Sequence, residues 1–256
     1  MTDHNLSIEQ SNQEDEYLFP YHYVSQFKNN NFKHSFLDTW SMNYVSTIEY
    51  LLRKIHIDPN TRIVDIGCGD GRFTRELSLA CLSATVVGID YSKRATALAS
   101  AMNQDIGNLT FRSLDITRKH DMEPFDVAVL MEVFEHIRIE DAGQFMGGVR
   151  SLLREGGLLY LTVPHENKLL EYKHFQHFSV EKIMDYLRPH FDVIEIVPFE
   201  RISWKRSLML KVLSNRLFIL NNPRLLSMIY LWYKKNLFFC ISENQCQRIF
   251  VKAVAR

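Results

Sequence analysis

The run Ile63-Val64-Asp65-Ile66-Gly67-Cys68-Gly69-Asp70-Gly71 constrains the fold of this chain more than any other stretch. A short apolar segment contains an acid, three glycines follow at alternate positions, and an amphipathic helix pattern begins at Arg72. This order predicts a buried parallel strand that turns sharply into a helix. Glycine adopts positive φ and lets a ligand approach with no Cβ in the way, and the first turn of a helix offers unpaired N–H groups. The stretch therefore indicates a ligand site at a strand end.

A second apolar run ends in an acid about twenty residues further on. Thr85 to Ile89 predicts the second strand, and Asp90 stands at its tip, where a carboxylate can accept from the two hydroxyls of a ribose. Strand, glycine turn, helix, strand and acid in this order favour a nucleoside-type ligand. The alternative is an ordinary tight turn between a strand and a helix.

The glycine spacing separates two classes of nucleoside ligand. Dinucleotide-binding folds use G-x-G-x-x-G, whereas here the third glycine comes one residue early. The run VDIGCGDG, followed by GIDYS, resembles the first two motifs of the class I S-adenosylmethionine (SAM)-dependent methyltransferases. The resemblance continues through LDIT and FDVAVLMEVFEHI to REGGLLYLTVP, so it extends over residues 62–198.

Apolar runs alternate with helical patterns, which predicts an α/β fold with a mostly parallel sheet. The resemblance implies a Rossmann-like three-layer sandwich whose seventh strand, at 248–254, is antiparallel and lies between strands five and six. About fifty residues precede that strand, too many for a structureless loop, and they predict helices over 208–220 and 223–239. The expected parts are a partly disordered N-terminal arm (1–35), a methyltransferase core (36–200), a helical insertion or cap (201–246) and the last core strand (247–256).

The resemblance also implies SAM as cofactor. It places these residues around it: Asp65, Gly67, Cys68, Gly69, Gly71, Asp90, Tyr91, Asp115, Ile116 and Met131. Asp65 would lie near the amino group of the methionine part, Asp90 would hold the ribose hydroxyls, and Asp115 would accept from the adenine amine. A turn acid with no ligand is the alternative for Asp115.

The segment from Met131 to His136 follows the fourth strand, at the edge of the sheet where ligands bind. Methyl transfer is an in-line displacement, so the protein mainly supplies alignment and exclusion of water. A base is needed where the acceptor carries a proton. The expected catalytic residues are Glu132, His136, His174 and His177. His136 as a loop-capping residue, and one of the later histidines as a packing residue, remain open.

Two carboxylates and two imidazoles at this place can also hold a divalent metal. The set Glu132, Glu135, His136 and His177 resembles that of the small-RNA 2′-O-methyltransferases, which bind a metal and a terminal ribose. Their longer motif around the second histidine is not matched, because Phe178 and Ser179 follow here. We therefore expect no metal, and a metal-dependent RNA 2′-O-methyltransferase remains an alternative.

The formal net charge is zero, so bulk charge indicates no partner. Residues 201–242 differ, because they hold no acid and eight bases: Arg201, Lys205, Arg206, Lys211, Arg216, Arg224, Lys234 and Lys235. Bulky aliphatic and aromatic residues separate these bases. One interpretation is a cap or dimer face with solvated charges. The other is a surface that lies on anionic lipid or holds an acidic, lipid-linked acceptor. Nucleic acid is less favoured.

Four cysteines form no C-x-x-C pair, which favours reduced thiols in a cytosolic protein. The polar N-terminus lacks a signal-peptide pattern, and no apolar run reaches the roughly eighteen residues of a membrane span. We expect a cytoplasmic enzyme, with peripheral contact at the inner membrane through 201–242 left open, as is its oligomeric state. The expected activity is SAM-dependent methylation of an oxygen on a small molecule, a glycan or a lipid-linked sugar. A nicotinamide-dependent dehydrogenase and a non-catalytic SAM-binding partner protein are the competitors.

Overall fold

A computed structural model describes residues 8, 10, 26–28, 31–33, 39–55, 58, 60–213, 217, 220 and 222–256. The predicted N-terminal arm lies outside these residues except for Ile8, Gln10 and the two short strands β1 (Gln26–Lys28) and β2 (Asn31–Lys33), which pair antiparallel.

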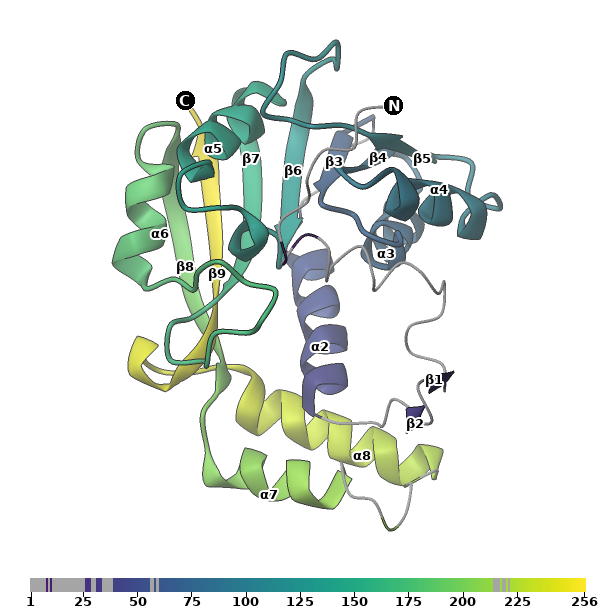
Figure 1. Cartoon of the computed structure of the whole chain (residues 1–256), viewed down its shortest axis with the longest axis vertical. Helices are drawn as coiled ribbons and strands as arrows, with labels where there is room; N and C mark the ends of the chain where they lie inside the picture. Colours follow the sequence, from purple (N-terminus) through teal and green to yellow (C-terminus); the bar gives the residue numbers. More distant parts are fainter. Residues whose placement is uncertain are drawn as a thin grey trace.

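Seven strands form one mixed sheet in the order β5-β4-β3-β6-β7-β9-β8 (Figure 1). The strands are β3 (Arg62–Ile66), β4 (Thr85–Asp90), β5 (Leu109–Ser113), β6 (Phe125–Met131), β7 (Leu153–Pro164), β8 (Phe191–Arg201) and β9 (Cys246–Ala255). β9 is antiparallel to β7 and to β8, and the other neighbouring pairs are parallel. The predicted seven-stranded sheet with an inserted antiparallel last strand is therefore confirmed.

Helices cover both faces of this sheet. Successive residues of a strand point to opposite faces, so they pack against different helices. Val64 packs into the cluster that contains α5 and α6, whereas its neighbour Ile63 packs into the cluster that contains α2 and α3. The helices of these layers are α2 (Thr39–Lys54), α3 (Arg72–Ala80), α4 (Lys93–Met102), α5 (Ala142–Ser151) and α6 (Val180–Leu187). A short 3-10 turn, η1 (Phe134–His136), follows β6.

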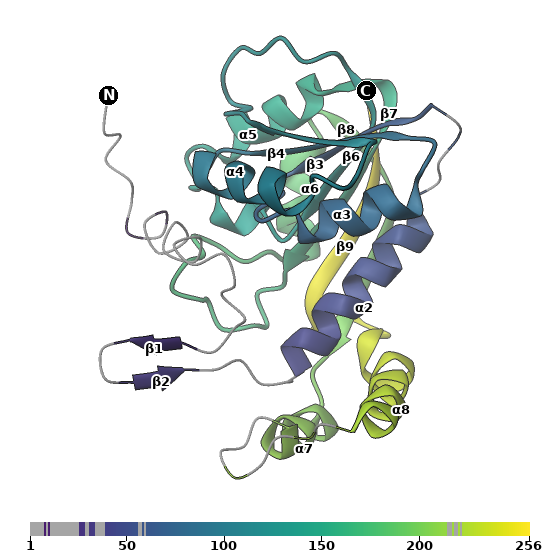
Figure 2. The ribbon, with the colours of Figure 1, turned by 90° about the vertical axis from the view of Figure 1, so that its right-hand side faces the viewer.

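The insertion lies at the carboxyl edge of the sheet, where β8 leaves and β9 begins (Figures 1 and 2). It consists of α7 (Trp204–Leu213), α8 (Pro223–Tyr233), a π-helical turn η2 (Lys234–Phe238) and a 3-10 turn η3 (Glu243–Gln245). The predicted bounds 208–220 were wrong for the first helix, which begins at Trp204 directly after β8. The predicted helix over 223–239 is α8 continued by the π-helical turn.

The insertion is anchored on α2. Tyr233, Leu237 and Phe238 are buried in the same cluster as Leu51 of α2. The hydroxyl of Tyr233 donates to Asn43 Oδ1 (3.4 Å), and Lys234 forms an ion pair with Glu49. One side of the insertion is thus part of the protein core.

Candidate active site

The glycine turn after β3 adopts the backbone that the sequence predicts. Gly67, Gly69 and Gly71 have φ of 73°, 54° and 81°, a region that residues with a Cβ rarely enter. A Cβ on Gly67 would lie 2.6 Å from the side chain of Val133, so the turn also approaches the segment after β6 closely. The N–H groups of Gly67 and Cys68 donate to Ile89 O at 2.8 and 3.0 Å, which fixes the turn to the end of β4.

Asp90 ties this turn to the next helix. Its Oδ2 accepts from the N–H of Gly69 (2.9 Å) and its Oδ1 from the N–H of Ser92 (2.8 Å). The hydroxyl of Ser92 in turn accepts from the N–H of Ala95 and caps α4. A carboxylate has about four lone-pair positions, so the two backbone contacts leave room for further donors such as hydroxyls.

A cavity of about 320 Å³ opens beside this carboxylate. Seven of the predicted site residues line it: Gly67, Asp90, Tyr91, Asp115, Ile116, Glu132 and His136. The ends of β3, β4, β5 and β6 thus contribute to one chamber, as expected where parallel strands end. Among the described residues, the predicted site residues outside its lining are Asp65, Cys68, Gly69, Gly71, Met131, His174 and His177.

The sequence did not single out several residues of the lining. They are Gln10, Thr117, Arg138, Asp141, Gln144 and Phe145, among others. Arg138 comes two residues after His136, so extending the segment from Met131 to His136 would have included it. Gln144 and Phe145 belong to α5 and reach the cavity only because that helix packs on the sheet. Gln144 donates to Thr117 O (3.1 Å), another residue of the lining.

Asp115 makes local contacts as well as lining the cavity. Its Oδ1 accepts from the N–H and from the hydroxyl of Thr117, at 3.1 and 2.6 Å, and its Oδ2 lies 3.0 Å from Arg118 Nε. Turn formation and ligand contact are therefore compatible at this residue.

Asp65 is fully buried in the strand, behind the glycine turn. Thr74 donates to its Oδ2 at 2.6 Å. Burial raises the pKa of this carboxyl from 3.8 to about 7, and the nearby Asp90 adds to the rise. An ammonium group beside Asp65 would offset the free-energy cost of burying its negative charge. This is consistent with the predicted contact between Asp65 and the amino end of a zwitterion.

The raised pKa of Asp65 predicts a pH-dependent stability. The folded state favours the protonated acid, so its contribution to the free energy of unfolding is complete below the unfolded pKa and is lost as pH rises from about 4 to about 7. We expect Asp65→Asn to stabilise the ligand-free protein, by an amount that grows over this range to as much as about 4 kcal/mol. Urea unfolding at several pH values measures it. A difference in the free energy of unfolding between Asp65→Asn and the wild type that does not change with pH would contradict the prediction.

A buried chain of charges connects the site to the insertion. Arg248 of β9 donates from Nε to Glu132 Oε2 (2.6 Å) and forms a second ion pair with Glu200 at the end of β8. Arg206 of α7 donates to the other oxygen of Glu200 (2.7 Å). Glu132 and Glu200 both have positive φ, 58° and 60°, and such backbone persists where surrounding contacts impose it. Arg248 therefore holds Glu132 at the cavity wall.

Arg248→Met is expected to lower the free energy of unfolding by about 3–5 kcal/mol at neutral pH, because it removes the cation of Glu132 and leaves the buried Glu200 with Arg206 alone. Arg154→Met is the control, since Arg154 is 64% exposed and pairs with Asp126 at the surface. That change should cost at most about 1 kcal/mol. Equal losses in the two variants, measured by urea unfolding, would contradict the assignment.

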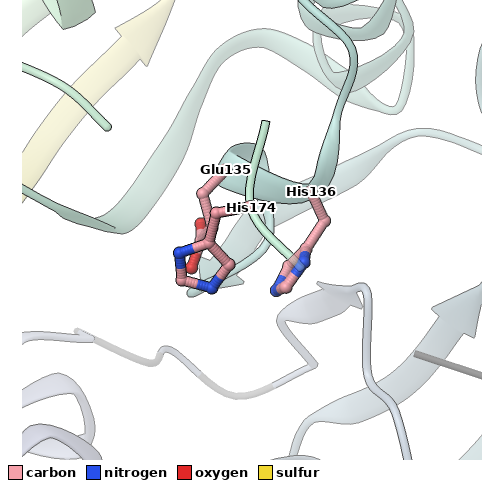
Figure 3. Close-up of side chains that lie close together, drawn as sticks. All are labelled: Glu135, His136 and His174. Carbon is pink, nitrogen blue, oxygen red and sulfur yellow. The ribbon is translucent and has the colours of Figure 1, made fainter. Parts of the chain in front are cut away.

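His174 and His177 lie in the loop after β7, and this loop packs against the segment after β6. The N–H of Phe175 donates to Glu135 O (2.9 Å), and the rings of His136 and His174 lie 4.8 Å apart between centroids. Figure 3 shows the side chains of Glu135, His136 and His174 close together. Single ligand atoms of these three lie within 4.8 Å of one another. Of the four residues of the metal alternative, the structure thus groups Glu135 and His136, with His174 rather than His177.

Carbonyl contacts determine which ring nitrogens carry protons. Nδ1 of His136 lies 3.0 Å from Lys173 O, and Nδ1 of His177 lies 3.0 Å from Lys168 O. A carbonyl only accepts, so both Nδ1 atoms carry the proton. Nε2 of His177 then accepts from Nδ1 of His174 (2.8 Å). In the neutral rings, Nε2 of His136 and of His174 is therefore unprotonated.

Burial disfavours the charged forms of Glu135, His174 and His177. It lowers the pKa of His174 to about 3, with His136 nearby adding to the shift, and it also lowers the pKa of His177. Burial raises the pKa of Glu135 well above its ordinary value, and the neighbouring Glu132 adds to that rise. Glu135 is 1% exposed, and its Oε2 has no hydrogen-bond partner. The cluster thus contains neutral imidazoles and a buried acceptor oxygen.

The comparisons with known proteins agree with this geometry. The family model described as a methyltransferase domain matches residues 63–157. The chain is 33% identical over 108 residues to the ubiquinone biosynthesis O-methyltransferase of Bradyrhizobium sp. (strain ORS 278), which is 41% of each chain. A second such enzyme, from Agrobacterium fabrum, is 30% identical over 128 residues, 49% of each chain. The chain thus spans about half the length of the curated relatives it matches.

Two solved structures have a fold similar to that of this chain. The N-methyltransferase NodS from Bradyrhizobium japonicum WM9, in complex with S-adenosyl-L-homocysteine, has a TM-score of 0.60 at 14% identity and covers 98% of this chain and 99% of its own. Magnesium protoporphyrin IX methyltransferase (ChlM) from Synechocystis PCC 6803 has a TM-score of 0.57 at 17% identity, over 88% of this chain and 90% of its own. The family model thus covers β3 to β6 and the start of β7, the strands whose ends build the cavity, and the whole chain has the fold of these methyltransferases.

Proposed function

We propose that this chain transfers a methyl group from SAM to a hydroxyl oxygen of a small molecule. The observation that carries the proposal is the shared cavity. Gly67 and Asp90, the residues suited to the cofactor, and His136, the residue suited to the acceptor, line one chamber. The names of the curated relatives support oxygen as the acceptor atom.

In this proposal the glycine turn and Asp90 bind the cofactor, and Asp65 attracts its amino group. When bound, SAM supplies a methyl group activated by its sulfonium sulfur, and S-adenosylhomocysteine remains after transfer. His136 accepts the proton of the acceptor hydroxyl at Nε2, because its Nδ1 proton is engaged by Lys173 O. The carbon–sulfur bond breaks as the carbon–oxygen bond forms.

The test has two stages. Calorimetry with SAM, S-adenosylhomocysteine and NAD establishes the nucleoside class, and binding of NAD without SAM would overturn the proposal in favour of a dehydrogenase. SAM carrying a labelled methyl group is then incubated with the protein and a cell extract, and the labelled fraction is identified by mass spectrometry. Label on a small molecule, a glycan or a lipid-linked sugar names the acceptor class. Binding of SAM without any labelled product would support a non-catalytic partner protein.

A second candidate is a metal-assisted form of the same transfer, and the cluster of Glu135, His136 and His174 favours it. Two unprotonated Nε2 atoms and a buried carboxylate oxygen form a set that suits zinc or a similar divalent ion. The carbonyl contact behind His136 is the kind of outer support that metal-binding histidines have. Here a bound cation would lower the pKa of the acceptor hydroxyl.

Metal removal distinguishes the two forms. The metal-assisted form predicts that EDTA abolishes activity and lowers the Tm, and that one divalent ion restores both. His174→Ala should remove metal-dependent stabilisation, whereas His165→Ala, which alters a histidine paired with Glu243 elsewhere, should retain it. Full activity in EDTA, with an unchanged Tm, would leave His136 as the base without a metal.

A further inference from the structure

Helix α7 presents an apolar stripe to solvent. Trp204, Leu208 and Val212 recur at every fourth residue and are 72%, 54% and 48% exposed. Residues at this spacing share one face of a helix. The opposite face already packs on the protein, where Leu213 is 5% exposed. The helix thus has two apolar faces. The rest of the described protein covers one of them, and the other is exposed.

Helix α8 repeats this arrangement. Leu225, Met228, Leu231 and Trp232 are between 41% and 67% exposed, and their spacing places them along one side. The other side carries Tyr233, which is buried against α2. Two neighbouring helices of one insertion therefore both expose large apolar side chains, which differs from the scattered exposed residues of an ordinary surface.

Positive charges flank these stripes. At 3.6 residues per turn, Lys205 and Lys211 stand on the two sides of the α7 stripe, and both are exposed. Arg224 and Lys235 are exposed on and after α8. Among the described residues, the structure places no acid in an ion pair with these four bases, whereas Arg206 and Lys234 pair internally. Since the whole chain is formally neutral, the rest of it has a matching excess of acids.

A hollow of about 390 Å³ adjoins the amino end of α7. Its lining includes Arg201, Ser203, Trp204, Lys205, Asn236 and Gln245. Two basic residues, a serine and two amide residues thus line one hollow together with the exposed Trp204. The hollow thus joins anion-binding groups to the apolar stripe.

We propose that α7 and α8 form a docking surface for an anionic lipid bilayer. The apolar stripes would enter the interfacial region while the bases and the hollow contact phosphate headgroups. A homodimer through this face would bring like charges together, whereas a bilayer offers both the apolar layer and the opposite charge. In the described part of the chain no helix has the length and apolarity to cross a bilayer, so the contact would be peripheral.

The surface lies at the end of the molecule where β8 ends and β9 begins (Figures 1 and 2). The ion pairs Arg206–Glu200, Glu200–Arg248 and Arg248–Glu132 connect α7 to the wall of the cavity. The proposal goes beyond methyl transfer and does not depend on it.

Vesicle flotation of the full chain tests the proposal. We expect binding to vesicles of phosphatidylglycerol and phosphatidylcholine in equal parts, weak binding to phosphatidylcholine alone, and release by salt. Lys205→Glu with Lys211→Glu should lower the partition coefficient about tenfold or more, and Trp204→Ser with Leu208→Ser should lower it similarly. All four side chains are exposed, so the Tm and SAM affinity should stay unchanged.

The matched control is Leu82→Ser with Lys119→Glu, which changes an exposed apolar residue and an exposed base outside the insertion. This control should bind the anionic vesicles like the wild type. Absence of vesicle binding by the wild type, or equal binding by all variants, would overturn the proposal. So would a dimer in light scattering that the serine pair dissociates while vesicles remain unbound, because that result assigns the face to a second copy of the chain.

Discussion

Gly69→Val is expected to abolish the binding of SAM. Gly69 has a φ of 54° and donates its N–H to Asp90 Oδ2. A β-branched residue is a severe outlier at this backbone conformation, so the turn must rearrange, and the contact with Asp90 is lost. Strain and the lost charge-assisted hydrogen bond together predict a fall in affinity of at least about 100-fold. Calorimetry with SAM and with S-adenosylhomocysteine measures this change.

Gly156→Val is the matched control for backbone strain. Gly156 has a φ of 74°, and a Cβ there would meet open space. Among the described residues it is outside the cavity lining. This variant should lose stability while it retains SAM affinity. Normal affinity in Gly69→Val, or an equal loss in Gly156→Val, would show that the glycine turn has another role.

His136→Ala is expected to lower kcat by about 100- to 10,000-fold, the usual contribution of a positioned general base. SAM affinity should change little, because Gly67 and Asp90 make the predicted cofactor contacts. Steady-state kinetics across pH, with calorimetry for SAM, measures the two effects separately.

His120→Ala is the control, because His120 contacts the hydroxyl of Ser151 away from the cavity lining. It should leave kcat unchanged. A normal rate in His136→Ala would reduce His136 to a residue that orders the loop through Lys173. A large loss of SAM affinity in that variant would assign it to the cofactor side.

The sheet could be predicted because its determinants are local. The continuous apolar run Phe125–Met131 forms the central strand β6. Ser92, a residue type that favours the N-cap position, caps α4. The place of the antiparallel last strand between the fifth and sixth strands came from the family resemblance, and the structure confirms it. The four cysteines are free thiols, and burial raises the pKa of the Cys68 thiol.

The catalytic side of the site was less predictable, because its contacts depend on loop packing. His174 and His177 are three residues apart, and spacing alone does not tell which imidazole reaches Glu135. The loop places His174 against His136 and turns Nε2 of His177 toward Nδ1 of His174. The exposed stripes of α7 and α8 were likewise undetermined, since a helix with apolar residues on several sides does not reveal which side the core covers.

The sequence by itself determined the glycine turn, the acid at the end of the next strand and the resemblance to the methyltransferases. Positive φ and strand patterning depend on neighbouring residues, so local chemistry carries that information. Only the tertiary structure decided that Glu132 is held by Arg248, 116 residues away, and that Asp65 is buried behind the turn. Such contacts arise when β9 enters the sheet and the loops close over its edge. Pairing and burial between distant segments follow from packing, which no local pattern encodes.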